Sequence, residues 1–268
     1  MNGVAQHRQQ SSEESGPEII ASIARAFAIL RSFRRGERAL GNKEIAERTG
    51  LPRSSVARIT ATLTQLGYLE HVPSQEKYAL GVGVLGLGQN YLAGLDVREL
   101  SRPLMLEMAQ DVKGTVALAA RDGDQMVFLE ICHGGQPFGL RLGVGERVPR
   151  GSTALGRAAH AALPEGERAR VLEAVRKSRD SRRDAVLKGL EQGVRDFKRH
   201  GFCLSLGDWD PNVHAAGVPM ASADGGKILA FSCFGPPNEM TRARLVGEIG
   251  PRLVALRDRV ARSLGGFQ

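Results

Sequence analysis

The sequence from residue 42 to residue 80 decides the fold: NKEIAERTGLPRSSVARITATLTQLGYLEHVPSQEKYAL. Residues 42–50 predict a short helix with Asn42 as its N-cap, because this side chain can accept a hydrogen bond from an unpaired N–H group of the first turn. Gly50 then ends the helix, since glycine readily adopts the left-handed conformation found at helix C-termini. A tight turn through Leu51 leads directly into the next helical segment.

That next segment, residues 52–67, predicts a second helix followed by a hairpin. Pro52 is acceptable in its first turn, because the N–H group that proline lacks would have no helical partner there. Residues 68–72 alternate between apolar and polar side chains, and residues 77–80 follow after a turn sequence. Two such runs around a turn predict a small β-hairpin.

A further amphipathic helix precedes this stretch, beginning near Pro17 and ending at Gly36. Two short helices joined by a tight turn, with a third helix before them and a hairpin after, describe a winged helix-turn-helix domain over residues 18–80. Helical spacing groups the apolar side chains of two of these helices into stripes. The stripes are Ile19, Ile23, Phe27 and Leu30 in the first helix, and Val56, Ile59, Leu63 and Leu66, which we expect to pack inward, in the helix 52–67.

The opposite face of the helix 52–67 carries hydroxyl, amide and guanidinium groups and no acidic residue. Such a face suits double-stranded DNA, because arginine can bind guanine through two hydrogen bonds and serine or threonine can bind phosphate or base. We expect contacts from this face and from its neighbours on the preceding helix and the wing. The predicted DNA-binding residues are Asn42, Lys43, Arg53, Ser54, Ser55, Arg58, Thr62 and Lys77.

The distribution of charge also favours DNA binding by this domain. The whole chain of 268 residues has a net charge of +8 and a pI of about 9.9, which favours an anionic partner. Nine basic and three acidic residues lie between Arg25 and Arg58, so most of the excess charge falls within the predicted domain. The alternative is a solvated basic face on a small helical bundle.

The glycines of GVGVLG, residues 81–86, match the G-x-G-x-x-G pattern of dinucleotide-binding enzymes. That pattern requires a preceding buried parallel strand and a crossover helix that returns to a second parallel strand. Here the preceding strand belongs to the hairpin, and Asp96 lies between two helical segments. We therefore expect the glycines to let a linker helix, residues 81–96, leave the hairpin and pack closely against a neighbour.

Strands and helices interleave over residues 97–268, which predicts a second, α+β domain. One of its strands is expected over 138–149, and a turn at 223–226 is expected to join two others. The polar residues 1–17 are expected to form a disordered tail. The three cysteines form no C-x-x-C pair and no run of apolar residues is long enough to span a membrane, so we expect a cytoplasmic protein.

No set of residues points clearly to a cofactor, a metal or a catalytic centre. The spacing of Cys132, His133, Cys203, His214 and Cys233 matches no zinc pattern, so we expect no metal and no cofactor. A hydrolase would need Ser152 or Ser205 beside His160 or His214 and beside Asp208 or Asp210. No G-x-S-x-G motif supports that arrangement.

Several segments resemble IclR-type transcriptional regulators. SIARAFAIL, NKEIAERTGLPRSSVARITATLTQLGYLE and YALGVGVLGLG are similar to the N-terminal domain of that family. GSTALGRAAHAAL, GFCLSLGDWDPNVHAAGVPM and LAFSCFGPP are similar to its C-terminal effector-binding domain. The resemblance covers about residues 18–264.

The resemblance implies a GAF-like sensor over residues 97–268 and a homodimer or a dimer of dimers. A dimer would place two recognition helices about one turn of DNA apart, so we expect a roughly palindromic operator. We expect a sequence-specific regulator whose ligand alters operator binding. The alternative is an enzyme that acts on a small organic acid and uses the N-terminal helices for dimerisation.

The resemblance also implies a ligand pocket against one face of the sensor sheet. The predicted effector-binding residues are Leu142, Ala154, Leu155, Gly156, Ser205, Leu206, Asp208, Trp209, Ala215, Ser232 and Phe234. Ala154, Leu155 and Gly156 lie at a helix start, where backbone N–H groups favour a carboxylate. The family carries a hydroxyl where this chain has Phe234, so we expect an organic acid with an aromatic or apolar body. The apolar residues could instead be ordinary core, above all Leu142 and Leu206.

Overall fold

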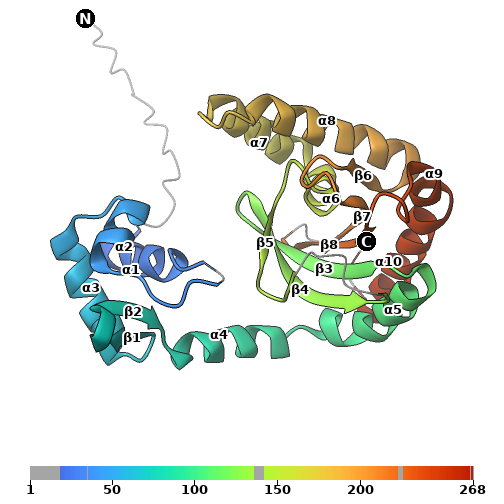
Figure 1. Cartoon of the computed structure of the whole chain (residues 1–268). Helices are drawn as coiled ribbons and strands as arrows, with labels where there is room; N and C mark the ends of the chain where they lie inside the picture. Colours follow the sequence, from blue (N-terminus) through green and yellow to red (C-terminus); the bar gives the residue numbers. More distant parts are fainter. Residues whose placement is uncertain (1–18, 35, 136–141, 223–225, 266, 268) are drawn as a thin grey trace, which may run out of the picture. The chain divides into compact units, whose positions relative to one another are not determined.

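The computed structural model describes residues 19–34, 36–135, 142–222, 226–265 and 267. The chain divides into two compact units between Asn90 and Tyr91 (Figure 1). The expected tail 1–17, the first part of the strand expected over 138–149 and most of the turn expected at 223–226 lie outside the described residues.

The first unit contains the predicted winged helix-turn-helix. Its elements are α1 (Ala21–Arg31), α2 (Asn42–Thr49), α3 (Arg53–Gln65), β1 (Leu69–Val72), the short 3-10 turn η1 (Pro73–Gln75) and β2 (Lys77–Leu80), and α4 (Val82–Ala93) crosses the division between the units. Strands β1 and β2 pair antiparallel, with Leu69 opposite Leu80 and Val72 opposite Lys77. The prediction of this order of elements is confirmed.

The helix caps differ from the prediction. Gly41, not Asn42, is the N-cap of α2, and its N–H group donates to the Glu44 carboxylate at 2.7 Å. Asn42 is therefore the first residue of the helix, and its Oδ1 atom lies 3.4 Å from the Thr60 hydroxyl instead of capping the first turn. Gly50 ends α2 with φ of 69°, as predicted, and Pro52 is the N-cap of α3 instead of lying in its first turn.

The core of the first unit contains part of each apolar stripe. Val56 and Leu63 of α3 are buried and Ile59 packs half-buried against the same core, but Leu66, the C-cap that follows the last residue of α3, is 63% exposed. The position between Val56 and Leu63 is filled by buried Thr60, whose hydroxyl donates to the Val56 carbonyl at 3.0 Å.

In α1 the buried residue is Ile29, whereas Ile23 and Phe27 on the opposite side are 53% and 52% exposed. Ile19 and Ile20 are also exposed. Leu30 of the predicted stripe packs half-buried against the core, whereas its other members lie on the surface of this unit.

The second unit is built on one sheet of six antiparallel strands in the order β5-β4-β3-β8-β7-β6. The strands are β3 (Thr115–Asp122), β4 (Gln125–His133), β5 (Arg147–Pro149), β6 (Cys203–Leu206), β7 (His214–Ala221) and β8 (Ile228–Gly235). The helices are α5 (Asp96–Val112), α6 (Ala154–Ala161), α7 (Glu165–Lys177), α8 (Arg183–His200), α9 (Arg242–Arg244), the π-helical turn η2 (Leu245–Ile249) and α10 (Gly250–Leu264). These bounds confirm the predicted α+β class.

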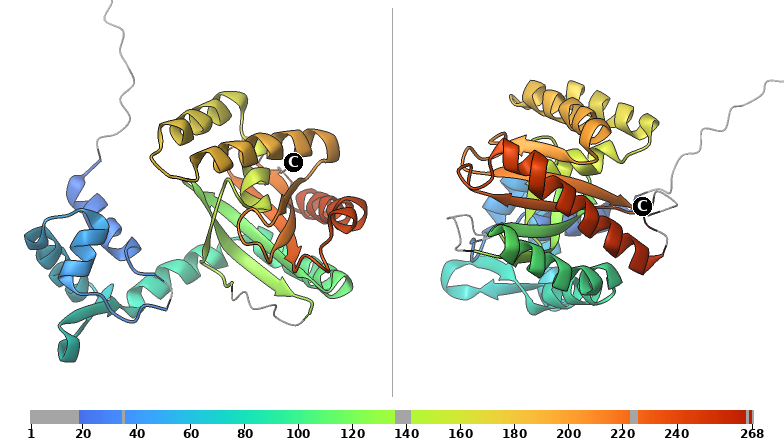
Figure 2. Two further views of the ribbon diagram at one scale, coloured as in Figure 1. Left: turned by 45° about the horizontal axis from the view of Figure 1, so that its top comes forward. Right: turned by 90° about the vertical axis from the view of Figure 1, so that its right-hand side faces the viewer.

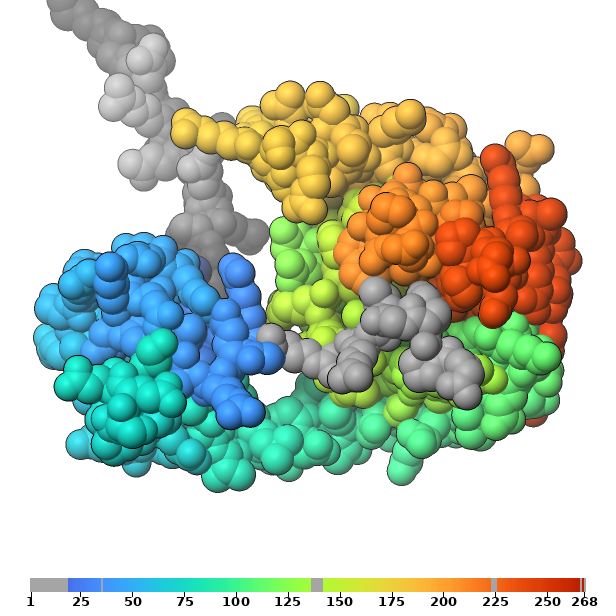
Figure 3. Space-filling model, viewed as in Figure 1, coloured from blue at the N-terminus to red at the C-terminus, as the bar shows by residue number. Residues whose placement is uncertain are grey.

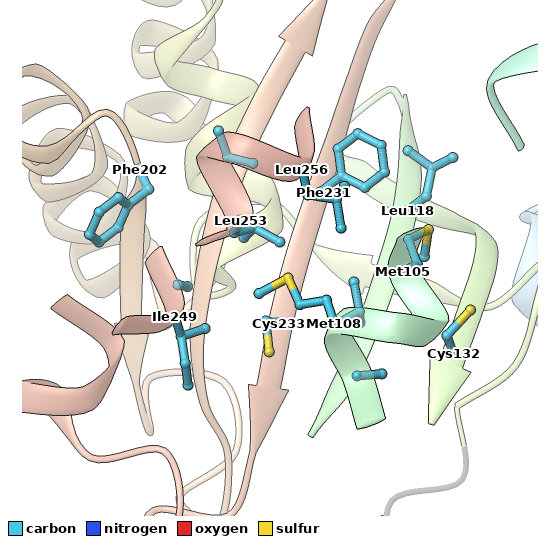
Figure 4. Close-up of a cluster of buried hydrophobic side chains, with 14 of the residues drawn as sticks. Met105, Met108, Leu118, Cys132, Phe202, Phe231, Cys233, Ile249, Leu253 and Leu256 are labelled. Carbon is cyan, nitrogen blue, oxygen red and sulfur yellow. The ribbon is translucent and has the colours of Figure 1, made fainter. Parts of the chain in front are cut away.

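Helices cover both faces of this sheet. Helices α5 and α10 lie side by side on one face, while α6 lies on the other face with α8 packed against it (Figures 1 and 2). The core beneath α5 and α10 includes Met105, Phe231 and Leu253, all fully buried (Figure 4). The core on the other side joins α6 to strands β3, β4, β7 and β8.

Helix α6 lies so close to the sheet that every one of its residues is buried. The approach depends on Gly217 in β7, where a Cβ atom would lie 2.5 Å from the Ala154 carbonyl oxygen. Because that oxygen belongs to the backbone, a side chain at this position would have to push the start of α6 away from the sheet.

We therefore expect Gly217→Ala to destabilise the protein by about 1–3 kcal/mol, the usual cost of overpacking a core. Gly166→Ala is the control, because a Cβ atom at that α7 position would meet nothing within 4 Å. The control should stay within about 0.5 kcal/mol of the wild type. Chemical denaturation followed by circular dichroism measures both, and equal stabilities for the two variants would contradict this account of the packing.

In the first unit, hydrogen bonds between side chains and backbone tie α2 to the segment that follows α1. The Arg48 guanidinium donates two hydrogen bonds to the Glu37 carboxylate, at 2.6 and 2.8 Å, and the Arg34 N–H group donates a third at 2.9 Å. The bond from Arg48 is the largest influence on this carboxyl and, with the bond from Arg34, lowers the pKa of Glu37 to about 2.

A lowered pKa means that the ionised carboxylate is favoured in the folded state. The stabilisation from Glu37 is therefore complete above the ordinary pKa of 4.5 and is lost as the pH falls towards about 2. We expect Glu37→Gln to speed hydrogen exchange of the α2 amides at pH 7, with the difference from wild type shrinking as the pH falls through that range. Glu47→Gln, which removes an exposed carboxylate 4.0 Å from Lys43, should change little.

Candidate functional site

Helix α3 presents the hydroxyl and guanidinium side chains predicted for DNA contact on its outer surface. Arg53, Ser54, Arg58 and Thr62 are exposed and Ser55 is half-buried. The Thr62 hydroxyl donates to the Arg58 carbonyl at 3.0 Å, so its oxygen remains able to accept a bond. Among the described residues, neither Arg53 nor Arg58 forms an ion pair, and α3 itself carries no acid.

The other predicted DNA contacts already have partners within the first unit. The Lys77 ammonium lies 3.2 Å from the Glu44 carboxylate, and Lys43 lies 4.0 Å from Glu47. Asn42 is half-buried, with its Oδ1 atom 3.4 Å from the Thr60 hydroxyl. The positive charge of these lysines is thus partly balanced, whereas that of the α3 arginines is not.

A pocket lies in the second unit, between the start of α6 and one face of the sheet, and its empty space of about 370 Å³ includes solvent at its open mouth. Its lining brings together eight of the eleven residues predicted for the effector: Leu142, Ala154, Leu155, Ser205, Trp209, Ala215, Ser232 and Phe234. Four further residues complete it: Phe128, Val148, Thr153 and Val213.

Strand register explains why residues far apart in the sequence meet in this pocket. Ser205 of β6 pairs with Ala215 of β7, and Ala215 pairs with Phe234 of β8, so the three form a row across neighbouring strands. Ser232 is two residues before Phe234 and therefore lies on the same face of the sheet.

Helix α6 closes the pocket with its N-terminal turn. Thr153 is the N-cap of α6: its hydroxyl oxygen accepts from the Gly156 N–H group at 3.1 Å and donates to the Pro149 carbonyl at 2.6 Å. The cap fixes the direction in which the first-turn N–H groups point, and Ala154 and Leu155 of that turn line the pocket.

Three residues predicted for the pocket do not line it. The Gly156 N–H group is used by the cap, and Leu206 packs on the core beneath α5 and α10 because neighbouring residues of a strand point to opposite faces. The Asp208 carboxylate instead lies 3.0 Å from the Arg157 guanidinium.

The sequence analysis missed the other four lining residues for two reasons. Thr153 had a readable signal, since a hydroxyl residue directly before a helical segment is a typical N-cap. Phe128, Val148 and Val213 are ordinary apolar residues whose inward position depends on pairings such as that of β4 with β5. Such pairings cannot be read from one sequence.

Polar groups at the pocket are few and neutral. The Ser205 side chain is 4% exposed and donates to the Ser152 carbonyl at 2.7 Å, while Ser232 is 2% exposed. The hydroxyls of Thr153, Ser205 and Ser232 and the start of α6 are thus the polar elements of a mainly apolar lining.

The alternative chemistries named from the sequence find no assembled site. Within the described ranges, no three His, Cys, Asp or Glu side chains gather as a metal would require. His160 has no hydrogen-bond partner on either ring nitrogen, and burial lowers its pKa to about 4. His214 contacts the Met240 carbonyl at 3.0 Å, so neither imidazole is bonded to Ser152 or Ser205.

Burial also raises the pKa of the Cys203 thiol, and it raises that of Cys233 to about 12. Both thiols are therefore protonated at neutral pH and unsuited to nucleophilic attack. Across the part of the chain that the structure describes, no helix is both long enough and apolar enough to cross a membrane.

Comparison with known proteins places these features in a family. Residues 22–73 match the model of the IclR helix-turn-helix domain, and residues 89–261 match that of the bacterial transcriptional regulator IclR C-terminal domain. The HTH-type transcriptional regulator TsaQ1/TsaQ2 of Comamonas testosteroni is 33% identical over 245 residues, covering 90% of this chain and 87% of that protein. The Pca regulon regulatory protein of Pseudomonas putida is 26% identical over 241 residues, covering 89% and 82%.

Solved structures agree. An IclR family transcriptional regulator from Brucella abortus has a TM-score of 0.86 at 36% identity, over 95% of this chain and 96% of that one. An IclR homolog from Microbacterium hydrocarbonoxydans, solved in complex with 4-hydroxybenzoate, has a TM-score of 0.68 at 22% identity, over 91% and 99%. This chain therefore belongs to the IclR family of transcriptional regulators, with an N-terminal helix-turn-helix domain for DNA binding and a C-terminal effector-binding domain.

Proposed function

We propose that this regulator binds its operator through the outer face of α3 and that an organic acid with an aromatic or apolar body controls that binding. The observation that carries the first part is the exposed, acid-free face of α3 with its two unpaired arginines. An arginine without an internal carboxylate partner loses no ion pair when it binds a guanine edge or a phosphate. Lys43, Lys77 and Asn42 are proposed as weaker contacts beside it.

The lining of the pocket supports the proposed class of effector. Phe128, Trp209 and Phe234 supply aromatic surface, and the start of α6 supplies N–H groups that favour a carboxylate. A small dicarboxylate would need a second charged or strongly polar anchor, and the lining contains only hydroxyls. The complex of the Microbacterium homolog with an aromatic acid is consistent with this proposal.

Exposed apolar side chains on α1 and α4 support a homodimer. Ile23 and Phe27 of α1, and Val82, Leu85 and Tyr91 on or beside α4, are each more than half exposed. Large exposed apolar side chains on one helix, as on α4, can mark a protein interface. A second copy would cover it and would present two α3 helices to a roughly palindromic operator in the cytoplasm, alone or as a dimer of dimers.

Effector binding would then act through α4, which links the two functions along the chain. In a dimer, the two DNA-binding units could adopt two spacings, and a ligand that binds one spacing more tightly favours it. Operator affinity then changes by the difference between the ligand's binding free energies for the two spacings, typically about 1–3 kcal/mol.

If Arg58 reads a base, we expect Arg58→Ala to weaken specific binding by about 1–3 kcal/mol, or roughly 5–150-fold in Kd. The measurement is fluorescence anisotropy with the intergenic DNA upstream of the gene and with a shuffled duplex. Arg179→Ala, which removes the same charge from the exposed loop between α7 and α8, is the control. Equal weakening on both duplexes would mean that Arg58 contacts only phosphate, and no weakening would refute the proposed face.

Trp209 is the only tryptophan and lines the pocket, so its emission reports occupancy directly. We expect benzoate and 4-hydroxybenzoate to quench or shift this emission and to change operator affinity, while pyruvate and glyoxylate do neither. Phe234→Ser should weaken aromatic acids by about 2–10-fold, the range expected for a lost aromatic contact. A response to pyruvate or glyoxylate alone would exclude the proposed effector class.

A further inference from the structure

The loop between β6 and β7 carries two side chains of the pocket, Trp209 and Val213. It begins at Gly207, whose φ of 83° requires glycine, and the Gly207 N–H group donates to the Val213 carbonyl at 3.1 Å. Inside the loop the Val213 N–H group donates to the Asp210 carbonyl at 2.9 Å. These backbone hydrogen bonds hold the two ends of the loop together. The position of the loop relative to the pocket therefore depends on its contacts with the rest of the domain.

Its main side-chain attachment is the ion pair between Asp208 and Arg157, and the Ser205 hydroxyl makes a longer contact of 3.5 Å with the same carboxylate. The Arg157 guanidinium lies 3.0 Å from the Asp208 carboxylate and also donates to the carbonyls of Gly151, at 3.0 Å, and Leu204, at 2.7 Å. One buried side chain thus joins the loop to β6 and to the segment before α6, which are the walls of the pocket.

The pair is unequal in its surroundings. The Arg157 side chain is 6% exposed, whereas that of Asp208 is 46% exposed. In the space-filling view, the orange residues that follow β6 lie at the surface beside the yellow residues of α7 and α8 and the red C-terminal residues (Figure 3). If the pair breaks, Asp208 can turn to water, but Arg157 keeps a buried charge with only two carbonyl acceptors. The cost of leaving the Arg157 charge without a carboxylate favours the closed pair. Because Asp208 is exposed to water, the free energy needed to break the pair stays modest.

The neighbouring helix is shaped around this arginine. Gly189 and Gly193 lie within α8, where glycine is normally unfavourable. A Cβ atom at Gly189 would lie 2.6 Å from Arg157 Nη2, and one at Gly193 would lie 2.7 Å from Arg157 Cβ. Gly189 therefore makes room for the guanidinium and for the Gly151 carbonyl that it binds, and Gly193 makes room for the base of the same side chain.

We propose that the Arg157–Asp208 pair is a latch that holds the Trp209 loop against the pocket, so that the two residues set effector affinity without touching the effector. They are positioning residues. When the latch is open, Trp209 leaves the pocket wall and the binding-competent fraction of the protein falls. This inference rests on the proposed effector pocket, but its first consequence, the mobility of Trp209, needs no ligand.

Acrylamide quenching of Trp209 in the full-length protein without ligand tests the latch. We expect Asp208→Asn to raise the quenching constant and shift the emission to longer wavelength, because the loop spends more time away from the pocket. Asp208→Glu, which keeps a carboxylate, should restore part of the wild-type value. Arg157→Lys should act in the same direction as Asp208→Asn, and far-UV circular dichroism establishes that each variant is folded.

Asp180→Asn is the matched control. Asp180 resembles Asp208 in three ways: its side chain is exposed (44%), it lies 3.4 Å from an arginine guanidinium, that of Arg182, and it accepts one backbone N–H bond. It differs in its place, because it lies between α7 and α8. It should leave Trp209 quenching unchanged. Equal quenching in Asp208→Asn, Asp180→Asn and wild type would overturn the latch.

Titration with 4-hydroxybenzoate provides the second measurement. If opening reduces the competent fraction to about a half or a tenth, the apparent Kd of Asp208→Asn rises about 2–10-fold. A wild type that binds no aromatic acid would refute the proposed effector class and leave the quenching result to decide the latch. An unchanged Kd in a variant with raised quenching would show that the loop opens without controlling the pocket, and would overturn the proposal.

Discussion

The effector-binding unit depends on a guanidinium buried inside it. Arg157 projects from a helix whose residues are all buried, and its charge is stabilised by Asp208 and by the carbonyls of Gly151 and Leu204. A charge in such a place is costly unless most of its donors are satisfied. The surrounding structure meets that demand with main-chain oxygens from two separate segments, and this fixes the distances between the segments that enclose the pocket.

The close packing of α6 is a second constraint on the same unit. Helix α6 must approach the sheet at Gly217 and helix α8 at Gly193, because any side chain at these positions would collide with backbone or with Arg157. The Thr153 cap then orients the first turn of α6 over the row Ser205, Ala215 and Phe234. Core packing, the cap and strand register thereby define one cavity, and its character is apolar because the sheet positions that face it are mostly apolar.

The DNA-binding unit depends on the side chains exposed on its surface and not on a buried cavity. Its core is small and is centred on Ile29, Ile45 and Val56. The bidentate contact between Arg48 and Glu37 neutralises an acid inside a basic region, and Lys77 does the same for Glu44. Three acids of α2 and of the segment before it, Glu37, Glu44 and Glu47, are thus paired with basic side chains, whereas the arginines of α3 have no such partner among the described residues.

The sequence by itself determined the winged helix-turn-helix, the α+β class of the second unit and most of the pocket. Local signals sufficed for the first two: Gly50 ends α2, and alternation followed by a turn sequence marks the hairpin of β1 and β2. The pocket residues came from motifs that resemble a known family. Tertiary structure alone decided that Ile29 and not Phe27 of α1 is buried, that Gly41 and not Asn42 caps α2, and that Asp208 binds Arg157 and does not line the cavity. Each of these depends on which partner a side chain meets across a helix pair or a strand pair, and a single sequence records spacing along the chain but not those pairings.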